Sequence, residues 1–180
     1  MKTRVALAIP TLNAAEDLWN LHDELFIEND LFYKKFLIDS SSNDRTIELA
    51  KQHGFETMVI PRKDFHHART RQLCVDHLQD AEIICFMTQD AHLARKDSVK
   101  NLIQAFDDPE VMAAYGRQRP RPQADAIEAH ARLFNYPSES QSKSLKDIER
   151  LGIKAAFMSD SFSAYRRSAL LGIGGFPDVR

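Results

Sequence analysis

The sequence has 180 residues, of which 43% are hydrophobic and 28% charged, and a formal net charge of −2 at pH 7. This length and composition suit one sizeable core and exclude disordered and fibrous classes. The charge gives no general attraction to nucleic acid, so no nucleic-acid partner is expected.

The compartment is predicted from the cysteines and from the apolar runs. Cys74 and Cys85 lie among apolar residues, which favours buried thiols over disulfides. No signal peptide is evident, and no apolar run approaches the ~20 residues needed to span a bilayer. We therefore expect a cytoplasmic protein whose membrane contact, if it has any, is peripheral and at the inner face.

The first third of the chain alternates strand and helix patterns. Residues 5–9 (VALAI) are typical of a strand buried on both faces. Asn13 and Glu16 then resemble a capping box that opens a helix, with Leu18, Leu21 and Leu25 at helical spacing. Residues 35–38 predict a second strand, and a helix is expected at 45–53 after the polar loop DSSSND.

The same alternation continues to residue 116. Strands are predicted at residues 56–60, 82–87 and 111–116, with helices at 68–78 and after Ser98. Alternating strands and helices predict an α/β protein with a mostly parallel sheet covered by helices on both faces. In such sheets, ligands bind beyond the carboxyl ends of the strands.

The pattern changes after residue 116. The segment GRQRPRP carries Arg117, Arg119 and Arg121, which could form a solvated loop, contact an anionic substrate or meet phospholipid head groups. A helix is expected at 124–135 and a serine-rich loop at 138–144. Residues 155–176 favour a strand, a turn and a short helix. We predict one unit at 1–116 and a second at 117–180.

Two aspartates, Asp39 and Asp90, lie at predicted strand ends, and Asp44 follows Asp39 by five residues. Asp39 could accept the imide N–H of a uracil or thymine base, or could form an Asx turn; position alone leaves the two equal. Asp90 could give an oxygen ligand to Mg²⁺ or Mn²⁺, ions that take most of their shell from water and phosphates, or could be a turn residue. For Asp44 we favour a helix N-cap.

Other kinds of site lack their sequence patterns. The loop after the first strand is PTLNA, without the glycines of a dinucleotide-binding turn, and no phosphate-binding loop is present. His66 and His67 have no partners at zinc spacing. In the same segment, Arg69 and Arg71 could pair with a diphosphate.

Five motifs together resemble the inverting glycosyltransferases of family 2, over nearly the whole chain. They are IPTLNA, IDSSSNDRT, FHHARTRQ, FMTQDA and SAYRRSALLGIGGFPD. Within that family, TQDA, GRQRPRP and ARLFNYP are most similar to bacterial rhamnosyltransferases acting on surface polysaccharides. The resemblance implies the GT-A fold, in which a nucleotide-sugar-binding half (here 1–116) joins an acceptor-binding half (begun at 117–180 and incomplete).

The resemblance also implies roles for individual residues. Thr11 and Asn13 would seat the nucleotide base, and Asp39 would read the pyrimidine. Arg71 would lie near the diphosphate. Asp90 corresponds to the last acid of the Asp-x-Asp motif and would hold Mg²⁺ or Mn²⁺, whereas Thr88 stands where that motif usually has its first acid.

By resemblance, the reaction would be transfer with inversion from a nucleotide-diphosphate sugar, dTDP-rhamnose being favoured, to a saccharide or lipid-linked saccharide. The family's catalytic base follows GGFP at some distance, and this sequence ends at Arg180 before such an acid. Asp160 is a weak candidate for the base. We therefore expect nucleotide binding with little transfer.

The alternative from another class is a non-catalytic nucleotide-binding or regulatory α/β module. A receiver domain would need acids where Pro10 and Thr11 stand. A nucleotidyltransferase would need a glycine-rich basic loop after the first strand, and PTLNAAEDL has neither feature.

Overall fold

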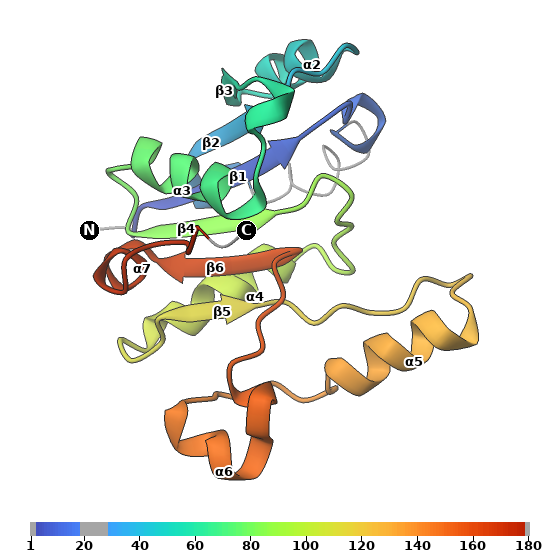
Figure 1. The fold of residues 1–180 in the computed structure, drawn as a ribbon, viewed down its shortest axis with the longest axis vertical. Coiled ribbons are helices and arrows are strands. Elements are labelled where there is room, and N and C mark those ends of the chain that lie inside the picture. The colour runs from blue at the N-terminus through green and yellow to red at the C-terminus, as the bar shows by residue number, and fades with distance from the viewer. Residues whose placement is uncertain (1–2, 19–28, 179–180) are drawn as a thin grey trace.

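The computed structural model describes residues 3–18 and 29–178. Six strands form one sheet in the order β3-β2-β1-β4-β6-β5 (Figure 1). They are β1 (Val5–Thr11), β2 (Phe32–Asp39), β3 (Glu56–Val59), β4 (Ile83–Met87), β5 (Ala113–Tyr115) and β6 (Phe162–Arg166). The predicted strands are thus present, with β5 shorter than expected.

The sheet is mostly parallel, as predicted. β1 pairs in parallel with β2 and β4, and β2 with β3, so the carboxyl ends of these four strands share one edge. β6 runs antiparallel between β4 and β5. Residues beyond 116 therefore return to the sheet, and the division of the chain at 116 stays a prediction.

Helices cover both faces of the sheet, which confirms the α/β class. They are α2 (Thr46–Gln52), α3 (His67–His77), α4 (Ser98–Gln104), α5 (Ala126–Asn135), α6 (Ile148–Leu151) and α7 (Arg167–Gly172). Short 3-10 helices are Asn29–Leu31, Arg62–Asp64, Ala105–Asp107, Leu145–Asp147 and Gly152–Ala155. Residues 15–18 are also helical, and the rest of the helix predicted there lies outside the described residues.

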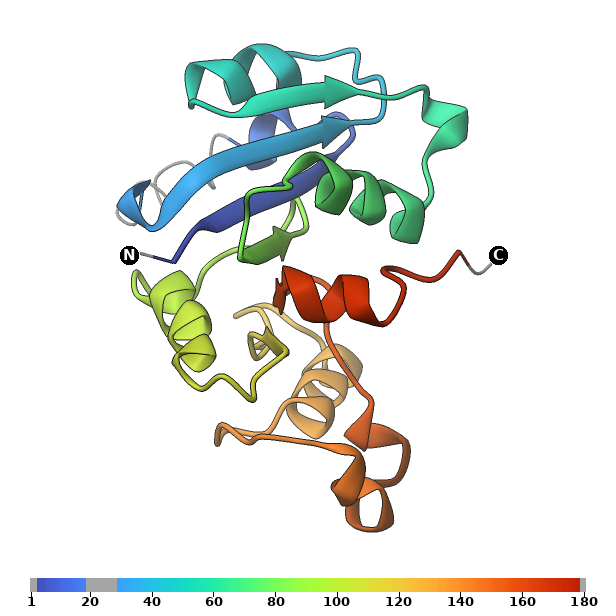
Figure 2. The same ribbon diagram turned by 90° about the vertical axis from the view of Figure 1, so that its left-hand side faces the viewer.

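Two apolar clusters lie on opposite faces of the sheet. Leu7 and Cys85 belong to the cluster that includes residues of α2 and α4, whereas Phe36 and Phe86 belong to the cluster that includes residues of α3 and α7. Figure 2 shows α4 on one side of the sheet and α3 and α7 on the other. Because neighbouring residues of a strand point to opposite faces, β1 and β4 must be apolar throughout, which is the run seen in the sequence. Each buried large side chain stabilises the fold by about 1.5–3 kcal/mol.

Cys74 and Cys85 are both buried thiols, as predicted, and they do not form a disulfide. Burial raises the pKa of the Cys74 thiol to about 12, so this thiol stays protonated and packs as an apolar group. Among the described residues, no helix combines the length and the apolar character needed to cross a membrane.

Residues 117–157 leave the sheet after β5 and carry α5 and α6, which project beyond it (Figure 1). A small aromatic cluster holds this excursion: the rings of Tyr115, Tyr136 and Phe157 lie 5.7–6.4 Å apart. Lys143 donates to the Tyr115 hydroxyl at 3.1 Å and to the Phe157 carbonyl at 2.7 Å. The excursion therefore has its own packing centre.

Candidate functional site

The predicted base-binding residues meet at the carboxyl ends of β1 and β2. Thr11 and Asp39 are the last residues of these strands and lie opposite each other in the ladder. The Thr11 hydroxyl donates a 3.0 Å hydrogen bond to Asp39 Oδ2, and both side chains are buried. Strand register thus joins two residues that the sequence separates by 28 positions.

Asp39 is fully buried and already hydrogen-bonded within the chain. Besides Thr11, it accepts from the Ser42 backbone N–H at 2.7 Å and from the Ser42 hydroxyl at 2.5 Å. An ionised carboxylate has about four acceptor positions, so these three bonds leave about one for a ligand N–H. Asp39 therefore shapes the turn after β2, and its role in reading a base stays a prediction.

Asn13 joins the loop after β1 to the loop after β2. Its backbone is left-handed, with φ of 50°, and its N–H donates to the Ser42 hydroxyl at 2.7 Å. Its side-chain oxygen accepts from the Asn43 N–H at 3.0 Å. The capping box predicted from Asn13 and Glu16 was wrong, because an N-cap residue needs an extended backbone.

The first helix is capped from the neighbouring loop. The Ala14 N–H donates to the Thr46 hydroxyl at 2.8 Å, and the Ala15 N–H donates to Asp44 Oδ2 at 3.1 Å. Asp44 also accepts the Thr46 N–H at 3.0 Å. The N-cap residue of α2 is Arg45, so Asp44 bonds to the helix start from one residue before the predicted N-cap position. Partial burial acts to raise the pKa of Asp44, but the bonds from Thr46 and Ala15 outweigh it and hold that pKa below its usual value.

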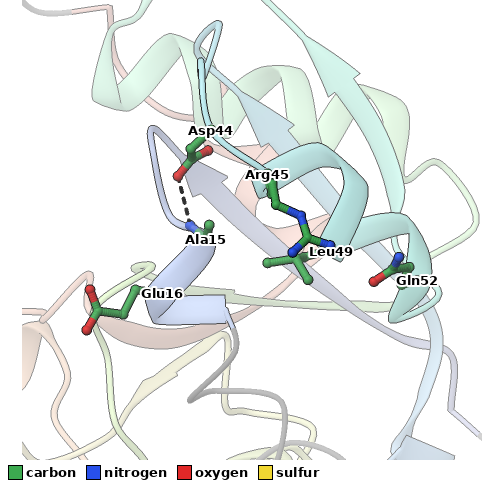
Figure 3. A pocket seen from close by; sticks show the side chains of 6 residues that line it. All are labelled: Ala15, Glu16, Asp44, Arg45, Leu49 and Gln52. Atoms are coloured by element: carbon green, nitrogen blue, oxygen red, sulfur yellow. Dashed lines mark hydrogen bonds between the residues drawn. The ribbon is translucent and has the colours of Figure 1, made fainter.

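A shallow pocket lies between these two helix starts (Figure 3). It is lined by Ala15, Glu16, Asp44, Arg45, Leu49 and Gln52. None of the residues predicted to bind nucleotide or metal lines it. The pocket is therefore separate from the predicted nucleotide-binding residues.

Asp90 lies in the turn after β4, at the same edge of the sheet, and its side chain is exposed. The turn is fixed by the Ala91 N–H donating to the Thr88 carbonyl at 3.1 Å, and the Thr88 N–H donates to the Ser161 carbonyl at 3.0 Å. Within residues 3–18 and 29–178, no three His, Cys, Asp or Glu side chains gather as a metal site. A cation at Asp90 would take most of its ligands from substrate and water.

Sequence reasoning missed Gln89. Its side-chain amide pairs with the Leu12 peptide group, accepting from the N–H at 2.8 Å and donating to the carbonyl at 3.2 Å. It also donates to Asp17 Oδ2 at 3.0 Å. A lone amide beside Asp90 was the only sequence signal, and its partners lie more than 70 residues away.

Arg71 is buried, with 5% of its surface exposed, and its charge is incompletely paired. One guanidinium nitrogen donates to the His67 carbonyl at 3.4 Å, another lies 3.9 Å from Asp160 Oδ2, and Nε has no partner. A buried cation with unused donors is costly unless an anion joins it. The structure thus brings Arg71 together with Asp160, the weak candidate for the base.

Asp160 has a half-exposed carboxylate and a second neighbour. The Tyr165 hydroxyl donates to it at 3.4 Å. Burial, with the nearby Asp160 charge, raises the pKa of Tyr165 to about 12, so this hydroxyl stays a donor.

The neighbours of Arg71 on α3 hold the GGFPD segment. Arg69 forms a two-bond ion pair with Asp178, both distances being 2.7 Å, and Gln72 accepts from the Phe176 N–H at 3.0 Å. The hydrogen bonds from Arg69 lower the pKa of Asp178. Asp178 is therefore exposed and ion-paired with Arg69. Arg117, Arg119 and Arg121 are all exposed.

Comparison with known proteins assigns the family. Residues 6–174 match the family described as Glycosyl transferase family 2. The chain belongs to this family. It is 46% identical over 177 residues to the O-antigen chain rhamnosyltransferase RfbN of Salmonella typhimurium, and 38% identical over 173 residues to the O-antigen chain rhamnosyltransferase WbaN of Salmonella anatum.

These family members are longer than the chain. The alignments cover 97% and 96% of the chain but 56% and 55% of the relatives, so it spans about half their length. Among solved structures, the fold is similar to the mannosyltransferase PcManGT of Pyrobaculum calidifontis, in complex with GDP-Man and Mn²⁺. That match has a TM-score of 0.69 at 21% identity and covers 99% of this chain and 49% of that one. The GT-A fold expected from the sequence is confirmed.

Proposed function

We propose that the chain forms the donor-binding part of an inverting glycosyltransferase that transfers a sugar, rhamnose being favoured, to a polysaccharide or lipid-linked saccharide. The observation that carries this proposal is that Thr11 and Asp39 end two parallel strands, and Asp90 follows a third, at one edge of the sheet. The identity to two O-antigen rhamnosyltransferases supports rhamnose.

The donor proposed is dTDP-rhamnose. Thr11, Asn13 and Asp39 would seat the pyrimidine, with the remaining acceptor position of Asp39 taking its imide N–H. The unpaired donors of Arg71 would take up diphosphate oxygens. The exposed Asp90 carboxylate would hold Mg²⁺ or Mn²⁺, which stabilises the charge of the departing diphosphate. PcManGT, a protein of the same fold, is seen with Mn²⁺.

Transfer with inversion needs a carboxylate that removes a proton from the attacking hydroxyl. Asp160 is exposed and lies beside Arg71, so it could meet an acceptor near the diphosphate. It stays the candidate base of this chain.

We also propose that the protein works in the cytoplasm and contacts the inner face of the membrane. Free buried cysteines support a reducing compartment. The excursion has eight Lys and Arg against five Asp and Glu, although the whole chain carries −2. It also exposes apolar side chains, among them Ile127 at 82% and Ile153 at 90%. Vesicles with anionic lipid should bind the chain, and Ile127→Glu should weaken this binding severalfold.

The experiment that tests the donor site is calorimetric titration of dTDP, UDP and GDP with Mn²⁺. We expect dTDP to bind the wild type, and Asp90→Ala to lose at least about tenfold in affinity, because the metal loses its protein ligand. Asp97→Ala, which changes an exposed carboxylate elsewhere, should bind like the wild type. Unchanged binding by Asp90→Ala would refute the role of Asp90. Nucleotide binding with no transfer by any longer relative would favour the regulatory module.

A further inference from the structure

We propose that Gln89 is a positioning residue that fixes the Asp90 turn against the loop after β1. The turn and the loop, which form the two sides of the donor site, thereby keep a fixed position relative to each other. This inference rests on the proposed function. Its structural basis is the three hydrogen bonds that the Gln89 amide makes to Leu12 and Asp17.

The first argument is the place of Gln89 in the sheet. β1 continues beside β2 as far as Thr11, but its pairing with β4 ends at Ala8 and Phe86. Beyond that point the two strands are no longer joined by the ladder. The opening is also where the strand order reverses, because β2 lies on one side of β1 and β4 on the other. Ligands of open α/β sheets bind in such a crevice.

The Gln89 side chain spans this opening. Its oxygen and nitrogen match the N–H and carbonyl of Leu12, at 2.8 and 3.2 Å, as a further rung of the ladder would. On the other side of β4, the Thr88 N–H is bonded to Ser161. The turn that carries Asp90 is thus held from both neighbouring strands, through Thr88 and through Gln89.

The second argument is that the position requires an amide. Only the oxygen can accept from the Leu12 N–H, and only the nitrogen can donate to the Asp17 carboxylate, so the two partners fix the orientation of the amide. A glutamate would set a negative charge against Asp17 and the Leu12 carbonyl. Since the bond to Asp17 involves an ionised acceptor, it is one of the stronger kind.

The test is the affinity of dTDP in the presence of Mn²⁺, measured by calorimetry on folded protein. Gln89→Glu should weaken binding about tenfold, because charge repulsion replaces two hydrogen bonds. It should also raise the Mn²⁺ concentration needed for half-maximal binding. Gln52→Glu is the matched control, since the Gln52 amide also donates to a carboxylate, Glu48 at 3.3 Å, but at an exposed position of α2. It should change affinity less than about twofold.

A second substitution separates positioning from loss of structure. Asp17→Asn alone should be nearly neutral, because an amide can still accept from Gln89. Combined with Gln89→Glu, it should recover most of the lost affinity, since the amide introduced by Asp17→Asn can donate to the new carboxylate. If Gln89→Glu does not fold, Gln89→Met, which removes all three hydrogen bonds without adding a charge, should also weaken dTDP binding about tenfold.

The outcomes are distinct. Wild-type protein that binds none of the three nucleotides overturns the proposed function and this inference with it. Wild type and Gln89 variants that bind equally well overturn this inference alone. A lower melting temperature with unchanged affinity for dTDP and Mn²⁺ also overturns it, because Gln89 would then be only a structural tie.

Discussion

The loops at the carboxyl ends of β1, β2 and β4 (the strand ends) and the excursion at 117–157 differ in the hydrogen bonding and burial of their side chains. At the strand ends, polar groups far apart in sequence bond to one another, and Asp39 and Thr11 are buried. In the excursion, α5 has no buried residue, and Phe134 is 62% exposed. The first region is held by hydrogen bonds within the chain, whereas the second presents apolar side chains to solvent.

The largest difference in stability is expected when one phenylalanine is removed from each region. Phe86 is fully buried and packs against the rings of Tyr165 and Phe176. Phe86→Ala should lower the free energy of unfolding by about 3–5 kcal/mol. Phe134→Ala, at an exposed ring, should change it by less than about 1 kcal/mol. Urea denaturation measures both, and equal losses would show that α5 belongs to the cooperative core.

A smaller effect is expected where α3 holds the GGFPD segment. Gly174 and Gly175 both have positive φ, of 93° and 80°. A Cβ at Gly175 would clash with Gln72 Oε1, whereas a Cβ at Gly174 has open space. Gly174→Ala should therefore cost about 1 kcal/mol from backbone strain, and Gly175→Ala about 1 kcal/mol more. Equal losses in urea denaturation would show that Gln72 moves aside freely.

The smallest effect concerns Asp44 and pH. Its pKa is lower in the folded protein than the usual value of 3.8. Its contribution to stability is thus complete above the unfolded pKa and is lost as pH falls through the folded pKa. Between pH 6 and pH 3, wild type should lose more stability than Asp44→Asn. Parallel pH profiles from urea denaturation would contradict this.

The sequence predicted what depends on local pattern. The apolar runs of β1 and β4 identified buried strands. Asp44 was expected at a helix start, and it bonds there to the Thr46 N–H two residues away, one residue before the N-cap Arg45. The parallel pairing of the strands was predicted from their alternation with helices. The predicted site residues Thr11 and Asp39 proved to be neighbours because parallel strands end at one edge.

What was missed depends on contacts between distant segments. The pairing of β6 between β4 and β5 cannot be read from its own residues, since either edge of the parallel block could accept a strand. Gln89 and Gln72 bond to partners 77 and 104 residues away, and an amide has no periodic pattern that would mark such a role. Asn13 was wrongly given a capping role because its left-handed backbone is set by the loop after β2.

The most direct test of the donor site compares two aspartates five residues apart, one at the end of β2 and one in the loop that follows. Asp39 is buried at the end of β2 in the proposed nucleotide site, whereas Asp44 accepts hydrogen bonds from the starts of two helices. Calorimetric titration of dTDP with Mn²⁺ should show binding by Asp44→Asn close to wild type and a loss of at least about tenfold in Asp39→Asn. Equal affinities for the two variants would contradict a nucleotide site at the carboxyl ends of β1 and β2.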